Sequence, residues 1–163
     1  MTAILNEVQA MQNPALGAGV IWRFVCGYSP SSSPKGTPLP LAFVVLPLVF
    51  HARTMEEVAG TLVSSGLRKL GEKFSREDGD ILLSLQPRML AMRDLTLRSL
   101  RIGLHAGLIT LVPGEAVLWP RSTTQPPDQP KPVTELFKAA EKFGNWCNEI
   151  SLFEVAGLLK VDF

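Results

Sequence analysis

Between residues 81 and 119, apolar positions first recur at helical spacing and then alternate, which predicts a long helix followed by two strands. One face of this helix carries Met92, Leu95, Ile102 and Ala106, and another carries Leu90, Leu97 and Leu104, which recur every seventh residue. A helix that is apolar on two sides is usually buried on both. The pattern therefore predicts a central helix with neighbours on both flanks.

A single polar stripe runs along the same helix. Its members are Asp94, Arg98, Arg101 and His105. Asp94 stands four residues before Arg98, the favourable order for an ion pair, which stabilises an isolated helix by about 0.2–0.5 kcal/mol. We expect this stripe to face either water or another molecule.

The helix is expected to end at Gly107, because glycine readily takes the left-handed conformation that closes many helices. Strands at Leu108–Val112 and Ala116–Trp119 then flank the turn sequence Pro113-Gly114-Glu115. A helix followed directly by a hairpin is typical of winged-helix domains, although many other α+β domains contain it. The predicted fold class is α+β, mainly helical and winged-helix-like.

The N-terminal part predicts a second buried helix. Residues 1–12 show only a weak helical pattern, which we interpret as an N-terminal arm. Asn13-Pro14 is a strong helix start, because asparagine caps the first turn and proline needs no amide partner there. The helix should run from Pro14 to about Tyr28. Arg23 is its one charge, and we expect it to pair with a carboxylate or reach solvent.

The middle of the chain is harder to interpret. The apolar run Leu39–Phe50 fits either a short buried helix or an extended segment. Thr54–Glu57 reads as a capping box, which predicts a helix that ends near Ser64 or Ser65 with Gly66 after it. Leu67–Phe74 predicts a short amphipathic helix. Pro87 should divide the following region into two pieces, from about Asp78 to Leu85 and from Pro87 onward.

Two proline-rich segments interrupt these elements. Ser29–Pro38 is expected to be a loop, and Pro120–Pro132, with five prolines, an extended connector. Helical spacing returns over Thr134–Cys147. A further capping box, Ser151–Glu154, precedes a helix at Val155–Leu159. The sequence thus predicts one domain over residues 1–163.

Composition narrows the possible functions. A net charge of +1 and a charged fraction of 19% give no electrostatic reason to expect binding to nucleic acid or to a membrane surface. Mean hydropathy is +0.18, which is high for a small domain without a membrane span. We interpret the excess as apolar surface that a partner protein covers.

The cysteines and the N-terminus favour a cytoplasmic protein. Cys26 and Cys147 lie in apolar helical contexts, where reduced, buried thiols are the usual case. Met1–Ala10 lacks the features of a signal peptide. The apolar run at Leu39–Phe50 is well short of the roughly 20 residues that span a bilayer. We therefore expect a soluble protein.

No catalytic constellation is apparent. With His51 and His105 as the two histidines and no paired cysteines, a zinc site is not expected. Gly17 and Gly19 follow a helix start and not a strand, so they do not form a nucleotide-binding loop. Arg98 and Arg101 are the two candidates for phosphate contacts, while the turn between the strands carries Glu115. Specific DNA binding by the chain itself is therefore not expected.

The sequence resembles a known family at several short motifs. They are Asn13-Pro14-Ala15, Trp22-Arg23-Phe24, Gly27-Tyr28 and Leu39–His51 with its Val45-Leu46-Pro47-Leu48 core. These are similar to the middle component of three-component ABC ATPase conflict systems, a group that includes the small subunit of Lamassu-type defence. The order of segments agrees over most of the chain.

The resemblance implies a non-enzymatic subunit without a cofactor. In such systems an SMC-like ATPase senses foreign DNA and a separate effector, often a nuclease, does the damage. The middle component would contact both proteins, in a role similar to the accessory subunits of SMC complexes, and would meet DNA indirectly. The resemblance brings no catalytic residues with it.

Our hypothesis is therefore an adaptor of a bacterial anti-phage or anti-plasmid complex, with no metal, no membrane and no small-molecule substrate. The candidate partner-binding residues are Asp94, Arg98, Arg101 and His105, together with the proline-rich loops at 29–38 and 120–132. Two alternatives stay open: a stand-alone winged-helix DNA-binding regulator, and a small hydrolase or transferase.

Overall fold

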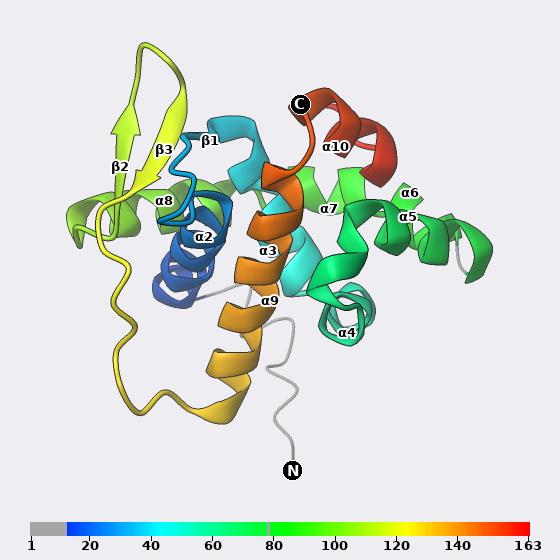
Figure 1. The fold of residues 1–163 in the computed structure, drawn as a ribbon, viewed down its shortest axis with the longest axis horizontal. Helices are drawn as coiled ribbons and strands as arrows, with labels where there is room; N and C mark the ends of the chain where they lie inside the picture. The colour runs from blue at the N-terminus through cyan, green and yellow to red at the C-terminus, as the bar shows by residue number, and fades with distance from the viewer. Residues whose placement is uncertain (1–12, 78) are drawn as a thin grey trace.

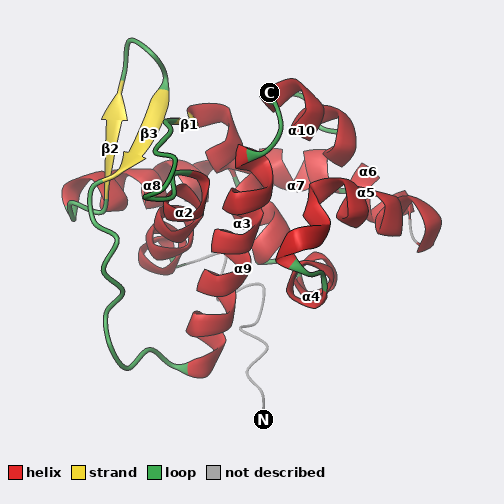
Figure 2. Cartoon of the chain, in the orientation of Figure 1, coloured by secondary structure: helices red, strands yellow, loops and turns green. Residues whose placement is uncertain are grey.

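A computed structural model describes residues 13–77 and 79–163. The predicted arm at residues 1–12 lies outside this range. Helices dominate, and a small sheet stands at one end (Figure 2), so the α+β, mainly helical class is confirmed. In chain order the elements are α2 (Pro14–Tyr28), β1 (Thr37–Pro38), η1 (Leu39–Leu41), α3 (Ala42–Val49), α4 (Ala52–Gly60), η2 (Val63–Ser65), α5 (Gly66–Glu77), α6 (Gly79–Leu83), α7 (Leu85–Ala91), α8 (Arg93–His105), β2 (Ile109–Val112), β3 (Val117–Pro120), α9 (Lys131–Asn148) and α10 (Leu152–Leu159).

Helix α2 is the centre of the fold. It begins as predicted: the Asn13 side chain accepts a hydrogen bond from the Leu16 amide at 3.0 Å, and Pro14 occupies the first turn. Eleven of its fifteen residues are buried. It packs against α9 and α8 (Figure 1). The prediction that the region from Ile81 to Trp119 is the central element is therefore wrong.

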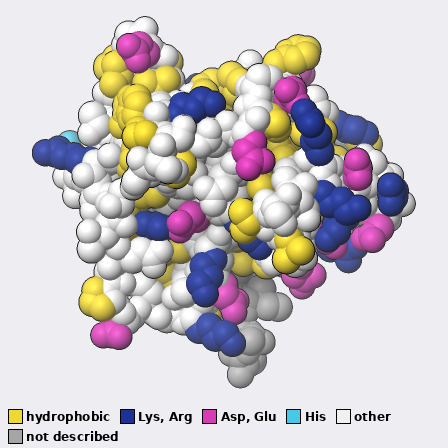
Figure 3. Space-filling model, viewed as in Figure 1, with side chains coloured by type: hydrophobic (Ala, Val, Ile, Leu, Met, Phe, Trp, Pro, Cys, Tyr) yellow, Lys and Arg dark blue, Asp and Glu magenta, His cyan; other side chains and the backbone are white. Residues whose placement is uncertain are grey.

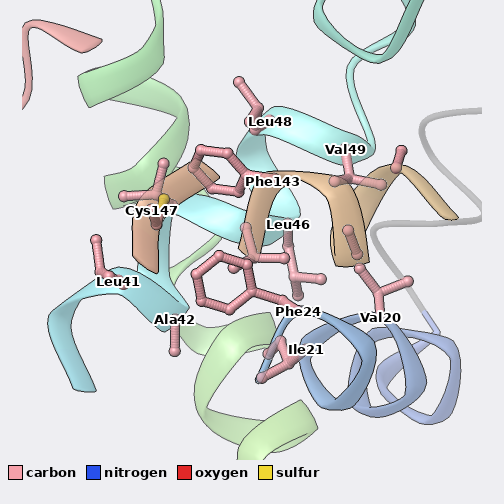
Figure 4. Packing of buried hydrophobic residues seen from close by; sticks show 14 of the residues in the cluster. Val20, Ile21, Phe24, Leu41, Ala42, Leu46, Leu48, Val49, Phe143 and Cys147 are labelled. Carbon is pink, nitrogen blue, oxygen red and sulfur yellow. The ribbon is translucent and has the colours of Figure 1, made fainter. Parts of the chain in front are cut away.

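The core forms where α2, α3 and α9 meet. Phe24 and Ile21 of α2 point toward Leu46 of α3 and Phe143 of α9 (Figure 4). The rings of Phe24 and Phe143 lie 5.3 Å apart between centroids. Removing these side chains from water supplies the main stabilisation of the fold, at about 25 cal/mol per Å² of apolar surface.

The apolar run at Leu39–Phe50 is helical. It forms the short turn η1 and then α3, of which seven of eight residues are buried. The run thus takes the first of the two predicted forms. Because α3 is apolar on all sides, its period could not show which form it would take.

Helix α4 differs from its prediction at both ends. It starts at Ala52, where the His51 ring accepts a hydrogen bond from the Thr54 amide at 3.5 Å, and it ends at Gly60. The Thr54 hydroxyl is buried and donates to the Leu48 carbonyl, so it does not cap a helix start. Gly66 takes φ +76° at the start of α5 and does not end α4.

The region after α5 consists of three consecutive helices, α6, α7 and α8, which we call the α6–α8 rod. Proline has no amide hydrogen, so Pro87 cannot bond to the Leu83 carbonyl, and α6 ends there. The predicted division is thus confirmed, with its boundary at Ser84. A second break, at Met92, was not predicted.

The burial of α8 differs from the prediction. Its buried residues are Leu95, Thr96, Ser99, Leu100 and Gly103, whereas Leu90 and Leu97 are 67% and 46% exposed. Helix α8 approaches α2 through small side chains: a Cβ atom on Gly17 would overlap the Ser99 hydroxyl oxygen. Of the predicted second face, Leu90 and Leu97 are exposed and Leu104 is partly buried against the core, so the prediction that this whole face is buried is wrong.

The predicted hairpin is confirmed. Gly107 takes φ +73°, and the Leu108 amide donates to the Gly103 carbonyl at 3.0 Å, which closes α8. Strands β2 and β3 pair antiparallel, with Leu111 opposite Leu118. An additional strand, β1, pairs with β3, which gives the order β1-β3-β2. The winged-helix assignment stays a prediction.

The C-terminal helices follow the sequence pattern closely. Helix α9 begins at Lys131, slightly earlier than predicted, because Pro132 fits the first turn of a helix. The Ser151 side chain accepts a hydrogen bond from the Glu154 amide at 3.1 Å, so the predicted cap of α10 is confirmed.

Within the described residues, no single helix has the length and hydropathy to cross a membrane. The pair Leu39–Val49 and Ala52–Gly60, bent by 101°, meets those criteria when taken together.

Candidate partner-binding surface

The predicted polar stripe lies on the exposed side of α8. Asp94, Arg98, Arg101 and His105 are all exposed. The Arg98 Nε donates to the Asp94 carboxylate at 3.0 Å, which is the predicted i,i+4 ion pair. Both side chains are at least half exposed, so this pair adds little stability. The structure leaves the stripe accessible, and its role in binding stays a prediction.

An apolar groove of about 380 Å³, which the sequence did not indicate, reaches Arg93 at the start of α8. Its walls come from η1, α3, α7, the first residue of α8, Ala116 just before β3, and the C-terminal residues. The main apolar side chains are Leu39, Phe43, Met89, Leu90 and Phe163. Of these, Leu90 and Phe163 are 67% and 47% exposed.

Few polar side chains line the groove. Gln86 lines it, but its side-chain oxygen already accepts the Asp162 amide at 2.9 Å. Arg93 and Asp162 stand at the edge. Small-molecule sites combine an apolar lining with a few polar groups that orient the ligand. This groove is better suited to apolar side chains of another protein.

The proline-rich connector is fastened to α2 at its beginning. The Trp22 indole donates to the Ser122 carbonyl at 2.5 Å, and the Arg23 guanidinium donates to the Thr123 carbonyl at 3.3 Å. The Cys26 thiol donates to the same Ser122 carbonyl at 3.5 Å. Residues 123–128 beyond these contacts are exposed. The exposed part of the predicted connector is therefore available to a partner.

Arg23 fulfils the expectation that it pairs with a carboxylate. Its guanidinium donates to Glu141 of α9 at 2.6 Å, with the arginine side chain 6% exposed and the glutamate 39% exposed. The guanidinium also lies 4.9 Å from the centre of the Trp22 ring. Arg23 thus joins α2, α9 and the connector, and its role is structural.

The loop at Ser29–Pro38 is folded back on the protein. The Ser29 hydroxyl accepts the Lys35 amide at 2.9 Å. The Lys35 ammonium donates to the Asn148 carbonyl at 3.1 Å and lies 5.3 Å from the centre of the Tyr28 ring. Residues 31–35 are nevertheless exposed and can contact a partner.

The two cysteines are free thiols. Cys147 is fully buried, and burial raises its pKa well above the usual value. Cys26 is partly buried; burial raises its pKa to about 11, with a smaller raising effect from Glu141 and an opposing effect from the Arg23 guanidinium. Neither thiol is activated as a nucleophile at neutral pH.

No three His, Cys, Asp or Glu side chains gather as metal ligands in residues 13–77 and 79–163. On the face seen in Figure 3, basic and acidic side chains are interspersed and form no large surface of one sign. This face therefore offers no basic track for a phosphate backbone.

The model of one protein family, described as ABC-three component (ABC-3C) system Middle Component 3, matches residues 1–163. No curated protein and no solved structure matches the chain.

Proposed function

Because this chain belongs to the Middle Component 3 family of ABC-three component systems, we propose that it is the non-enzymatic adaptor of such a system. It would bind an SMC-like ABC ATPase and link it to an effector, often a nuclease. The system would act in the bacterial cytoplasm against phages or plasmids, as Lamassu-type defence does. No cofactor or small-molecule substrate takes part.

The observation that carries this proposal is the family match over the whole chain, since the family description names one component of a larger assembly. The surface supports it. The apolar groove exposes Leu90 and Phe163, and Arg93 at the start of α8 lines it. Exposed apolar surface with a polar border is typical of a site that another protein covers.

A stand-alone DNA-binding regulator receives less support. The turn between β2 and β3, which would contact DNA in a winged-helix protein, carries Glu115 and no lysine or arginine. Arg98 of α8 is already paired with Asp94. A purified chain that binds duplex DNA at low salt, and loses binding on Arg98→Ala plus Arg101→Ala, would favour the regulator instead.

Co-expression tests the adaptor proposal. The three components of one ABC-3C system are expressed together, with a tag on this chain, and the complex is analysed by size-exclusion chromatography. We expect the ATPase and the effector to elute with the tagged chain. The result that contradicts the proposal is a monomer that elutes alone while the other two components associate without it.

A further inference from the structure

The exposed leucines of the α6–α8 rod are regularly spaced. Leu83, Leu90 and Leu97 stand seven residues apart and are 62%, 67% and 46% exposed. We call these three residues the leucine ridge. Single exposed leucines are common on protein surfaces, but a series at heptad spacing is the pattern of a coiled-coil seam.

The three leucines lie one on each of three consecutive helices, Leu83 on α6, Leu90 on α7 and Leu97 on α8. Each junction residue bonds to the helix on either side: the Ser84 amide donates to Asp80 at 3.0 Å while its carbonyl accepts from Arg88 at 3.2 Å, and the Met92 amide donates to Arg88 at 2.9 Å while its carbonyl accepts from Thr96 at 3.0 Å. Helices α6, α7 and α8 follow one another along the length of the molecule in Figure 1. Seven residues make about two helical turns, and at each of these positions along the three helices the leucine is exposed.

Two exposed arginines border the ridge. Arg93 and Arg101 lie four residues before and after Leu97, and both are exposed. In the part of the chain that the structure describes, neither forms an ion pair. In coiled coils, charges beside the apolar seam select a partner helix with the opposite charge.

We propose that the leucine ridge and the adjoining groove bind an α-helix of another component of the system. That helix carries leucine or isoleucine at heptad spacing, with acidic residues beside them that face Arg93 and Arg101. One of its apolar side chains enters the groove next to Leu90. This inference rests on the proposed adaptor function and names the surface that performs it.

A second copy of this chain fits the ridge less well. Along α6, α7 and α8 the carboxylates are Asp80 and Asp94, and Asp94 is occupied by Arg98. Counted with Arg88 and Arg98, the three helices carry four arginines against these two aspartates, so two copies facing each other would repel even with Asp162 at the groove. The charges therefore favour a partner with more acidic residues of its own.

The first test compares substitutions of ridge leucines with a substitution of an exposed leucine outside the ridge. The variants Leu90→Glu plus Leu97→Glu, and the milder Leu90→Gln plus Leu97→Gln, are co-expressed with the other components. Leu62→Glu is the control, because Leu62 is 71% exposed but lies away from the ridge. We expect the glutamate pair to reduce the recovered partner about tenfold or more, and the control to leave it unchanged.

The same experiment separates the two proposals. If the wild-type chain associates with no component, both the adaptor function and the ridge are refuted. If it associates and the ridge variants behave as Leu62→Glu does, the ridge proposal is wrong and the adaptor function stands. Thermal unfolding of every variant checks that it is folded.

Photo-crosslinking in the assembled complex identifies the occupant. A photoreactive amino acid replaces Leu90, and in the control it replaces Leu62. Crosslinks from position 90 to one helical segment of another component, with apolar residues seven apart and acidic neighbours, support the proposal. Crosslinks to a second copy of this chain, or to a segment without such spacing, overturn it.

A charge-reversed pair, Arg93→Glu plus Arg101→Glu, should also weaken recovery of the partner.

Discussion

Gly144 of α9 lies against Gly27 of α2 so closely that a Cβ atom on Gly144 would stand 3.1 Å from the Gly27 carbonyl carbon and would overlap the Phe24 carbonyl oxygen. Gly27 makes the reciprocal approach, since its Cβ atom would overlap the Glu141 carbonyl oxygen. Two helices whose backbones touch in this way need glycine on both sides. The contact fixes the position of the central helix.

We predict that Gly144→Ala destabilises the protein by about 2–4 kcal/mol, or prevents folding, because the nearest atoms are backbone and cannot move aside. Gly157→Ala is the matched control. Nothing lies within 4 Å of a Cβ atom there, and alanine favours the α10 helix by up to about 1 kcal/mol. Urea unfolding measures the free energy of unfolding of both variants. Equal stability of the two variants would mean that the helices are not in backbone contact.

Glu141→Gln removes the carboxylate that neutralises Arg23. We expect a loss of about 1–2 kcal/mol in the free energy of unfolding, below the ~3–5 kcal/mol for a fully buried pair, because solvent screens the 39% exposed Glu141. Arg98→Ala is the comparison and should cost about 0.5 kcal/mol or less, since its pair with Asp94 is on the surface. Urea unfolding that ranks the two variants in the opposite order contradicts this assignment.

Trp22→Phe keeps an aromatic ring on α2 but removes the donor to the Ser122 carbonyl. Losing a hydrogen bond of about 1 kcal/mol should release the connector roughly fivefold more often. Trypsin cleavage after Arg121, followed by mass spectrometry, reports this opening. Trp146→Phe removes a different indole donor, to the Val63 carbonyl at 2.9 Å, and should leave that cleavage rate unchanged.

The Cys26 thiol makes stability dependent on pH in the alkaline range. Its pKa is about 11 in the folded protein against 9.0 ordinarily, so between these values the folded state binds more protons than the unfolded state. The stabilising contribution is complete below about pH 9 and is lost as the pH rises through 11.

Unfolding at pH 8 and pH 10.5 tests this sign. The wild-type protein should lose more stability between the two values than Cys26→Ala does. The remaining loss in the variant comes from groups such as Tyr28, whose pKa is also raised, mainly by burial. A variant that loses as much as the wild type would show that Cys26 does not titrate in this way.

Local sequence signals determined many helix ends and the hairpin. Asn13-Pro14, the Ser151 capping box and Gly107 each act within a few residues, and each is found as predicted. Thr54 shows the limit of such signals. Its hydroxyl donates a hydrogen bond to the Leu48 carbonyl, a contact that the capping pattern does not predict.

Periodicity correctly predicted that the leucines of α7 and α8 recur at helical spacing. It did not predict which face of α8 is buried. The buried side of α8 includes Thr96, Ser99 and Gly103, which a search for large apolar residues passes over. Ser99 is buried because Gly17 lets α2 come close, and Gly103 lies against the Ile109 side chain. The same seven-residue spacing serves a core or a partner's seam equally well. Strand β1 was missed because two residues, one of them proline, carry no strand pattern.

The candidate site was predictable in part. The polar stripe and the exposed stretch of the connector follow from the sequence, and both are accessible. The groove was not foreseeable, because its walls come from segments far apart in the chain, from Leu39 to Phe163.

The attachment of the connector also has a mechanical consequence. Strand β3 leads directly into Ser122 and Thr123, which Trp22 and Arg23 hold against α2. A pull on the hairpin is thus transmitted to the innermost helix over three residues of chain, without stretching the loose segment that follows. A displacement of the hairpin should therefore move α2 directly. Residues 124–130 lie between this attachment and α9, so they can change conformation without moving α9.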